Sequence, residues 1–323
     1  MIHSQHFDVY ILSCEPDGGV YHYKMNDSGK CVLSSKYTLD RPMYAVIDNN
    51  KMFVVLRQPF DDNSDSGVVT FDVLKDGSLA QNDGIVSTKG EVACHILSSA
   101  GKLYCTNYIS GSVILLPDKL VCHSGCGVNP VRQSSPHTHC VISSPDEKYV
   151  LVTDLGLDSI FVYDKNLELK SKAMVPGGHG ARHILFSDDG KYLYCANELA
   201  STLSVFEYND GKLTLIDTKS VLPEDFKGES TASAIRSRDG FVFVSNRGHD
   251  SISCMKFDGQ TLSLQYTVDC GGQTPRDFNF AGDFLLSANQ DSNNVTVFGY
   301  SCGKLQKIAD EIKIDSPLCI LEG

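Results

Sequence analysis

Short apolar strands alternate with polar turns along the whole chain, and one such strand recurs at regular intervals. Its seven copies are VYILSC (9–14), MFVVLR (52–57), LYCTNY (103–108), VLVTDL (150–155), LYCANE (193–198), VFVSNR (242–247) and LLSANQ (285–290). Their first residues are separated by 43, 51, 47, 43, 49 and 43 positions. A period of about 40 to 50 residues built only from strands is typical of a β-propeller, with one blade per repeat. The pattern therefore predicts an all-β fold, a seven-bladed β-propeller with four antiparallel strands per blade.

One repeat can be followed in full over residues 180–216. Its expected strands are GARHILFS, KYLYCANE, LSVFEY and KLTLID, and the turns between them are DDG, ELAST and NDG. Aromatic and β-branched residues fill such strands, whereas Gly, Asp and Asn mark tight turns. No segment of the chain has a sustained apolar period of 3.6 residues, so we expect almost no helix.

The two ends of the chain complement each other. The chain begins near a second-strand sequence, HFDVYILSC, and ends at DSPLCILEG, which resembles the first-strand sequences TPRDFNF and ARHILFS. The C-terminal strand is therefore expected to supply the missing inner strand of blade one, and residues 1–323 to form a single domain. Such closure removes the free sheet edges that promote aggregation.

The charge of the chain limits its partners. The net charge is −12, from 28 basic and 40 acidic residues. A nucleic acid or an anionic membrane needs a basic surface, so neither is expected as a partner. A small phosphorylated ligand remains compatible, because a few local arginines suffice. We see no signal peptide and no apolar run of about 18–20 residues that could span a bilayer, so we expect a cytoplasmic protein.

Cysteine is frequent, with twelve residues, but its spacing does not indicate a metal site. Cys122 and Cys126 form the only close pair, and two further ligands at matching spacing are missing. We expect free thiols, no metal and no other cofactor.

Polar residues interrupt the first strands at matching positions. In a propeller the first strand of each blade lines the central channel, so these residues share one neighbourhood although they lie far apart in sequence. His137 precedes His139 by two positions, which puts both side chains on one face of the strand. Alignment of the repeats places together His139, Arg182 and Arg276, with Ser233 near them, and Cys140 opposite His183.

The ends of the second strands give two further columns. One holds Ser13, Leu56, Asn107, Asp154, Asn197, Asn246 and Asn289, and most simply caps the turn into the third strand by hydrogen bonding to the backbone. The other holds Cys14, Arg57, Tyr108, Leu155, Glu198, Arg247 and Gln290.

A residue that stabilises the repeat should be alike in every blade. The variation in the second column therefore indicates a surface shaped for a ligand, with solvated rim charges as the alternative.

These side chains suit acid–base and anion chemistry. Arginine presents a planar fork that fits carboxylate or phosphate, and histidine exchanges a proton near neutral pH. Glu198 is the candidate base, or the group that orients a histidine. Such a set can hydrolyse an ester-like bond, or only bind an acidic sugar. The sequence contains neither a Gly-x-Ser-x-Gly nucleophile elbow nor a nucleotide-type glycine loop.

Long segments resemble the lactonase family of seven-bladed propellers, which includes propeller-type 6-phosphogluconolactonase and is related to carboxymuconate-cyclising enzymes. The segments that carry the resemblance are SPHTHCV (135–141), GARHILFSDDGKYLYCANELASTLSVFEY (180–208), SAIRSRDGFVFVSNRGHDSI (233–252) and PRDFNFAGDFLLSANQDSNNVTVF (275–298). The first three repeats match less well, and Asp277 follows Arg276 where the family has histidine. The pocket is therefore expected to come from blades four to seven.

The resemblance implies hydrolysis of 6-phosphogluconolactone to 6-phosphogluconate without a metal, so a small phosphorylated sugar lactone is the expected ligand. The residues that it assigns to the channel mouth are His137, His139, Arg182, His183, Glu198, Arg247 and Arg276. We add Asn197, Asn246 and Gln290 as candidate substrate contacts.

The expected mechanism follows from these residues. The arginines hold the phosphate and the carbonyl, and His139 or His183, steadied by Glu198, activates water. A lactone-forming cycloisomerase and a non-catalytic binding scaffold are the alternatives, and we expect a monomer or a weak homodimer.

Overall fold

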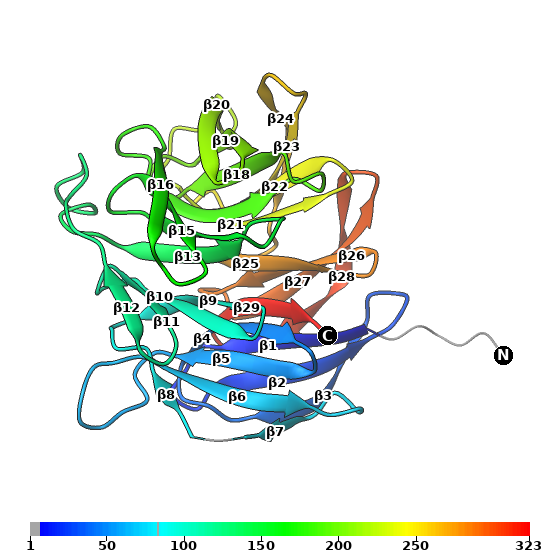
Figure 1. Cartoon of the computed structure of the whole chain (residues 1–323). Coiled ribbons are helices and arrows are strands. Elements are labelled where there is room, and N and C mark those ends of the chain that lie inside the picture. The colour runs from blue at the N-terminus through cyan, green and yellow to red at the C-terminus, as the bar shows by residue number, and fades with distance from the viewer. Residues whose placement is uncertain (1–6, 83) are drawn as a thin grey trace.

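The computed structural model describes residues 7–82 and 84–323, and these form seven antiparallel sheets (Figure 1). Each inner strand contacts the inner strands of the two neighbouring blades, and this series of contacts closes on itself. The seven-bladed propeller predicted from the repeat is therefore confirmed. The described part of the chain contains no helix, and so none that could cross a membrane. Residues 1–6, which bear on the expectation of no signal peptide, lie outside it.

The two inner strands of each blade carry the site and much of the core. The second strands are buried on both faces, because each sheet is sandwiched between its neighbours. The inner strands are β29 (Pro317–Glu322), β4 (Pro42–Asp48), β9 (Ala93–Ser99), β13 (Thr138–Ser143), β17 (Ala181–Phe186), β21 (Thr231–Arg238) and β25 (Pro275–Ala281). The second strands are β1 (Phe7–Ser13), β5 (Lys51–Leu56), β10 (Lys102–Asn107), β14 (Tyr149–Asp154), β18 (Tyr192–Asn197), β22 (Phe241–Arg247) and β26 (Phe284–Asn289).

The two outer strands of each blade become progressively more polar. The third strands are β2 (Gly19–Met25), β6 (Gly67–Val73), β11 (Ser112–Leu115), β15 (Ser159–Asp164), β19 (Thr202–Asn209), β23 (Ser251–Phe257) and β27 (Asn294–Ser301). The outermost are β3 (Cys31–Tyr37), β7 (Leu79–Gln81), β8 (Val86–Ser87), β12 (Lys119–Cys122), β16 (Leu169–Met174), β20 (Lys212–Ser220), β24 (Leu262–Asp269) and β28 (Lys304–Lys313). In blade two the outermost strand is interrupted, since β7 and β8 both pair with β6. Exposed lysines on β16 and β20 discourage pairing with another chain.

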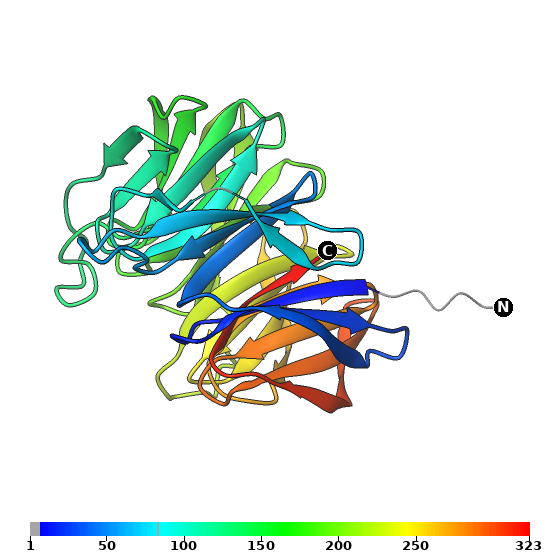
Figure 2. The same cartoon turned by 90° about the horizontal axis from the view of Figure 1, so that it is seen from below.

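The chain closes the ring as its ends predicted. Strand β29 pairs antiparallel with β1 and completes the sheet β29-β1-β2-β3. Both views show the red C-terminal strand beside the blue first strand (Figures 1 and 2). Turn chemistry is also as expected: Asp210 and Gly211 have φ values of 42° and 79° between β19 and β20, in the NDG turn.

The hydrophobic core is distributed over the joints between blades. Seven buried clusters can be distinguished, and each combines residues of two adjacent blades. Strand β29 contributes to two of them: Ile320 packs between blades seven and one, and Leu318 and Cys319 pack between blades one and two. The closing strand therefore holds two interfaces together in addition to one sheet.

Deletion of residues 316–323 is expected to lower the free energy of unfolding by at least about 5 kcal/mol, since each buried Leu or Ile lost costs about 2–5 kcal/mol. Leu318, Cys319 and Ile320 are buried, and β1 would also lose its partner. Chemical denaturation measures the change. As a control, Leu33→Ser on exposed strand β3 should shift stability by less than about 0.5 kcal/mol. A truncated chain that unfolds at the full-length midpoint would contradict this role.

Candidate active site

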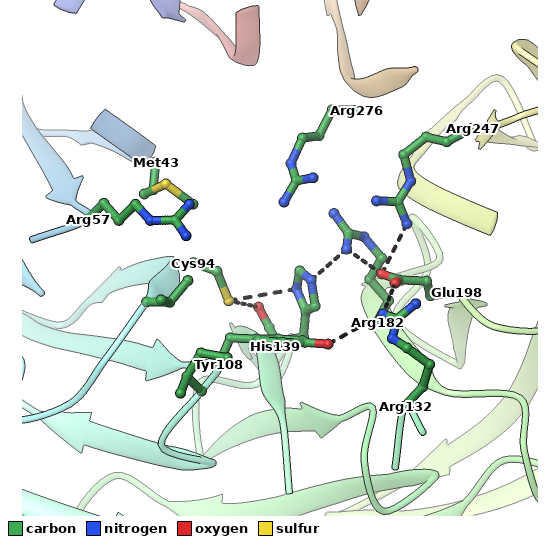
Figure 3. A pocket seen from close by; sticks show the side chains of 12 residues that line it. Met43, Arg57, Cys94, Tyr108, Arg132, His139, Arg182, Glu198, Arg247 and Arg276 are labelled. Atoms are coloured by element: carbon green, nitrogen blue, oxygen red, sulfur yellow. Dashed lines mark hydrogen bonds and ion pairs between the residues drawn. The ribbon is translucent and has the colours of Figure 1, made fainter. Parts of the chain in front are cut away.

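A pocket of about 300 Å³ lies where the inner strands begin and the second strands end (Figure 3). Its lining comes from six blades and not only from blades four to seven, so that expectation was wrong. Blades two and three contribute through the same repeat positions as the later blades, although they carry other residues there. The lining residues are Met43, Arg57, Val92, Cys94, Tyr108, Ile109, Arg132, His139, Arg182, Glu198, Arg247 and Arg276.

Each inner strand has a β-bulge, and five of the seven bulges aim a side chain at this pocket. At the bulge two residues of the inner strand oppose one residue of the second strand, and such bulges often re-aim side chains beside active sites. In blade five, for example, Ala181 pairs with Asn197 and His183 pairs with Ala196, which leaves Arg182 unpaired. The first residues left unpaired at the bulges are Met43, Cys94, His139, Arg182, Ser233, Arg276 and Leu318.

Several bulges are held by a hydrogen bond from a hydroxyl group of the preceding blade. Thr106 Oγ1 donates to the carbonyl oxygen of His139 at 3.2 Å, and Thr153 Oγ1 donates to that of Arg182 at 2.6 Å. Ser233 Oγ donates to the carbonyl of Arg276 at 2.7 Å. The backbone of these pocket residues is therefore held in place before any ligand arrives.

Glu198 is the centre of an arginine cluster. Its Oε2 lies 2.5 Å from Arg182 Nη1 and 3.1 Å from Arg247 Nη2, and its Oε1 lies 2.7 Å from Arg132 Nη2. Burial alone would raise the pKa of Glu198, but the surrounding guanidinium groups lower it well below its ordinary value. Glu198 therefore stays ionised. About three of its four lone-pair positions are occupied, which leaves one position on Oε1 for a water molecule.

His139 is held as a neutral imidazole. Its Nε2 lies 2.6 Å from Arg182 Nη1, which can only donate, so Nε2 is the acceptor. Burial lowers the pKa of His139 well below 6.5, and the charge of Arg182 lowers it further. Glu198 therefore does not orient a histidine as expected: its carboxylate binds arginines, and His139 binds one of the same arginines.

Two further arginines face the pocket without partners. Among residues 7–82 and 84–323, the guanidinium groups of Arg57 and Arg276 have neither an ion pair nor a hydrogen bond. In Figure 3 Arg57 lies beside Met43 on the side opposite Glu198, and Arg276 lies between them. Within the described residues, five guanidinium groups thus line the pocket with a single carboxylate. This concentration of positive charge, in a chain of net charge −12, suits an anionic ligand.

The lactonase family model, described as a seven-bladed β-propeller, matches residues 8–322. The chain belongs to the lactonase family.

This lactonase-family propeller is similar in sequence to curated proteins and in fold to solved structures. An uncharacterized protein of Staphylococcus aureus strain USA300 is 33% identical over 305 residues, which cover 87% of this chain and 88% of the relative. A crystal structure of a candidate 6-phosphogluconolactonase from Bacteroides fragilis superposes with a TM-score of 0.88 at 26% identity, covering 98% of both chains. The periplasmic gluconolactonase PpgL of Pseudomonas aeruginosa has a TM-score of 0.87 at 26% identity, covering 98% of this chain and 99% of PpgL.

His183 of this lactonase-family chain faces a second, smaller space. A cavity of about 20 Å³ shares part of the pocket wall and adds Tyr44, His183, Asp277 and Leu318. Burial lowers the pKa of His183 well below its ordinary value, and Arg182 lowers it further. Its ring centroid lies 5.1 Å from that of His139. Asp277 is paired with Arg236 at 3.0 Å.

Four predicted ligand contacts lie outside the pocket lining of this lactonase-family protein. His137 stacks on Tyr108 with ring centroids 4.5 Å apart, so it supports the pocket wall. Asn197 donates to Thr202 Oγ1 and Ser204 Oγ, and Asn246 donates to Ser251 Oγ and Ser253 Oγ. Their amide groups bridge the turn into the third strand, so the structural role predicted for this column holds, but the acceptors are side-chain hydroxyls and not the expected backbone groups. Gln290 donates to Ser316 Oγ at 3.3 Å, near the junction of blades seven and one.

Seven of the twelve lining residues were not selected from the sequence, and three of these, Arg57, Tyr108 and Arg132, carry a guanidinium or phenol group. Arg57 and Tyr108 belong to the variable second-strand column, so the signal was present there. Arg132 lies in the loop after β12, at no repeated position, and nothing in the sequence pointed to it. For metal binding, no group of three or more His, Cys, Asp or Glu side chains in residues 7–82 and 84–323 is placed to hold an ion.

Proposed function

We propose that the protein hydrolyses an anionic sugar-acid lactone, with 6-phosphogluconolactone as substrate and 6-phosphogluconate as product. The observation that carries the proposal is the separation of the pocket into two parts. Arg57 and Arg276 offer unpaired cations, whereas Arg182 and Arg247 surround an ionised carboxylate, Glu198. An ester-like carbonyl beside Glu198 and a phosphate beside the unpaired arginines would use both parts.

Electrostatic stabilisation supplies most of the proposed rate enhancement. The carbonyl oxygen becomes negative when water adds, and cations fixed beforehand stabilise that charge without reorganisation. The Nε atoms of Arg182 and Arg247 are buried and have no hydrogen-bond partner in the described part of the chain. Burial lowers the pKa of Arg247 to about 10, with a further contribution from Arg182, so Arg247 still carries its proton at neutral pH. Both arginines line the pocket and can therefore present N–H groups to the oxyanion.

Glu198 acts as the general base in this proposal. A water molecule bound at Oε1 attacks the carbonyl carbon and gives its proton to the carboxylate. When the tetrahedral intermediate collapses, the ring C–O bond breaks and the leaving oxygen takes that proton. His139 accepts a hydrogen bond from Arg182 and so positions the guanidinium. Lactones hydrolyse spontaneously, so a weak but correctly placed base is sufficient.

The catalysed rate is expected to stay nearly constant as the pH falls from about 7.5 to about 5, unlike the loss typical of a histidine base with an ordinary pKa. The pKa of Glu198 is lowered well below 4.5, so the base remains ionised over this range, and the lowered pKa of His139 keeps the imidazole neutral. Gluconolactone, which carries no phosphate, is the control substrate because its charge does not change. A fall in rate centred near pH 6.5 would indicate a histidine base.

The proposal is tested by following hydrolysis of freshly generated 6-phosphogluconolactone above its spontaneous rate. Acceleration at least about tenfold stronger for the phosphorylated lactone than for gluconolactone is expected, because a charge-assisted contact to phosphate contributes about 1.5–3 kcal/mol. Equal acceleration of both lactones would argue against a phosphate subsite. Absence of acceleration with either lactone would exclude the proposed activity.

One observation favours a second candidate, a cycloisomerase that forms or opens a muconate-type lactone. Asn, Gln, Ser and Thr, which commonly bind sugar hydroxyls, are missing from the residues found to line the pocket. Met43, Val92 and Ile109 add apolar surface there, which suits an acid with several carboxylates and few hydroxyls. Ultraviolet absorbance distinguishes turnover of an unsaturated muconate from hydrolysis of a saturated sugar lactone.

A further inference from the structure

Arg132 differs from the other arginines of the cluster in its position in the chain. It lies in the long loop between β12 and β13, and its Nη2 lies 2.7 Å from Glu198 Oε1 and 3.4 Å from the Tyr108 hydroxyl. Arg182 and Arg247 come from strands β17 and β22 and bind the other carboxylate oxygen, Oε2. Arg132 is thus the partner of the oxygen that the proposed mechanism assigns to water.

The backbone beside Arg132 is firmly anchored. Gln133 is fully buried, and its Nε2 donates to the carbonyl of Leu155 at 2.8 Å. At the start of the loop, His123 Nδ1 lies 2.6 Å from Asp154 Oδ2, and His123 Nε2 lies 2.7 Å from the Tyr163 hydroxyl. The loop therefore presents Arg132 at a fixed place on the rim, and only its side chain is free to change partner.

Exposure identifies Arg132 as the exchangeable member of the cluster. Its side chain is 42% exposed, whereas those of Arg182 and Arg247 are 5% and 14% exposed. An ion pair with one solvated partner is weaker than a buried one, because water competes for the guanidinium. An anion that enters from solvent can therefore attract Arg132 more easily than Arg182 or Arg247.

We propose that Arg132 is a specificity-determining positioning residue that responds to the charge of the substrate. In the free protein it binds Glu198 Oε1. An anionic group on the incoming lactone draws the guanidinium to itself, which leaves both lone-pair positions of Oε1 open to water and makes Glu198 more basic. A neutral lactone cannot do this and meets a carboxylate that is less basic, with Arg132 still on Oε1. The inference rests on the proposed lactone hydrolysis. It adds that the site selects anionic substrates through a higher kcat as well as through a lower KM.

Substitution of Arg132 tests this with two lactones. In Arg132→Gln the ratio of kcat for 6-phosphogluconolactone to kcat for gluconolactone should fall at least about tenfold, a difference of about 1.4 kcal/mol. Its kcat for gluconolactone should rise, because Arg132 no longer binds Oε1 and no longer makes Glu198 less basic. Arg132→Lys keeps the charge and should retain part of the selectivity. A fall by one common factor for both lactones would show that Arg132 acts only on the structure of the site and would overturn the inference.

Arg41→Gln is the matched control. Arg41 has a side chain 43% exposed, comparable to that of Arg132, and pairs only with Asp40 among the described residues. It does not line the pocket. The ratio of the two kcat values should therefore stay as in the wild type.

Binding of inorganic phosphate decides the inference separately from catalysis. Calorimetry would compare the wild type, Arg132→Gln, Glu198→Gln and the double variant. Two factors are compared: the change in phosphate affinity caused by Glu198→Gln in the wild-type background, and the same change in the Arg132→Gln background. If Arg132 exchanges partners, Glu198→Gln tightens binding more in the first background, by at least about threefold, within the range known for interacting residues. The same factor in both backgrounds would overturn the exchange. Wild-type protein that hydrolyses no lactone but shows this coupling would refute the proposed function and leave the exchange intact.

Discussion

Glu198→Gln is expected to lower kcat for lactone hydrolysis by a factor of about 10² to 10⁴, the contribution of one general base. The amide keeps the shape of the side chain but cannot accept the proton of the attacking water. KM should stay constant or fall, because Arg182, Arg247 and Arg132 lose their counter-charge and attract the anionic substrate more strongly. Initial rates corrected for spontaneous hydrolysis measure both parameters.

Two comparisons separate chemistry from folding in this variant. Glu229→Gln removes an exposed carboxylate outside the pocket lining and should leave both parameters unchanged. Removing one partner of a buried ion cluster typically costs about 3–5 kcal/mol, so Glu198→Gln should also unfold earlier. Phosphate at millimolar concentration should restore part of that stability if it binds at the arginines as proposed, since a ligand that binds only the folded state stabilises it. An unchanged kcat in a folded variant would remove Glu198 from the reaction.

The repeat made the fold predictable from the sequence. Each copy of the second strand ends at the same height in its blade, so a column of aligned residues becomes a ring in space. Arg57, Tyr108, Glu198 and Arg247 belong to one such column, and all four line the pocket. The aligned first-strand residues His139, Arg182 and Arg276 reach it as well. The sequence did not reveal that a β-bulge aims these three side chains.

Pairing inside the site could not be predicted in the same way. The columns bring Glu198 near both histidines and arginines, and the choice between them depends on side-chain reach. Arg182 reaches Glu198 and His139 together, so the expected Glu–His contact is replaced by two contacts to one guanidinium. Arg132 escaped notice because its loop follows no repeat. The weak resemblance of the first three repeats to the family did not predict whether they contribute to the pocket. Met43 and Cys94 line it because they occupy the bulge position in their blades that Arg182 occupies in blade five.

Arg182→Ala is expected to lower kcat/KM by a factor of about 10² to 10³, as is typical when one donor to an oxyanion is removed. Arg182 is the only residue in the described part of the chain whose side chain is hydrogen-bonded to both Glu198 and His139, so its loss also releases two other site residues. The nearest positive charge then disappears from His139, whose pKa should rise from its lowered value, although burial still holds it down. NMR titration of the His139 ring would follow that rise.

The combination of losses distinguishes catalysis from packing in Arg182→Ala. Arg182→Lys keeps the charge but not the planar fork, so its kcat/KM should lie between those of Arg182→Ala and the wild type. Arg238→Ala removes a half-buried arginine that packs on Phe280 and Tyr300 away from the pocket. It should lower the melting temperature and leave kcat/KM unchanged. If Arg182→Ala retained wild-type kcat/KM, the oxyanion would have to be stabilised by Arg247 and Arg276 alone. The hydrogen bonds of Arg182 to Glu198 and His139 would then serve only the structure of the site.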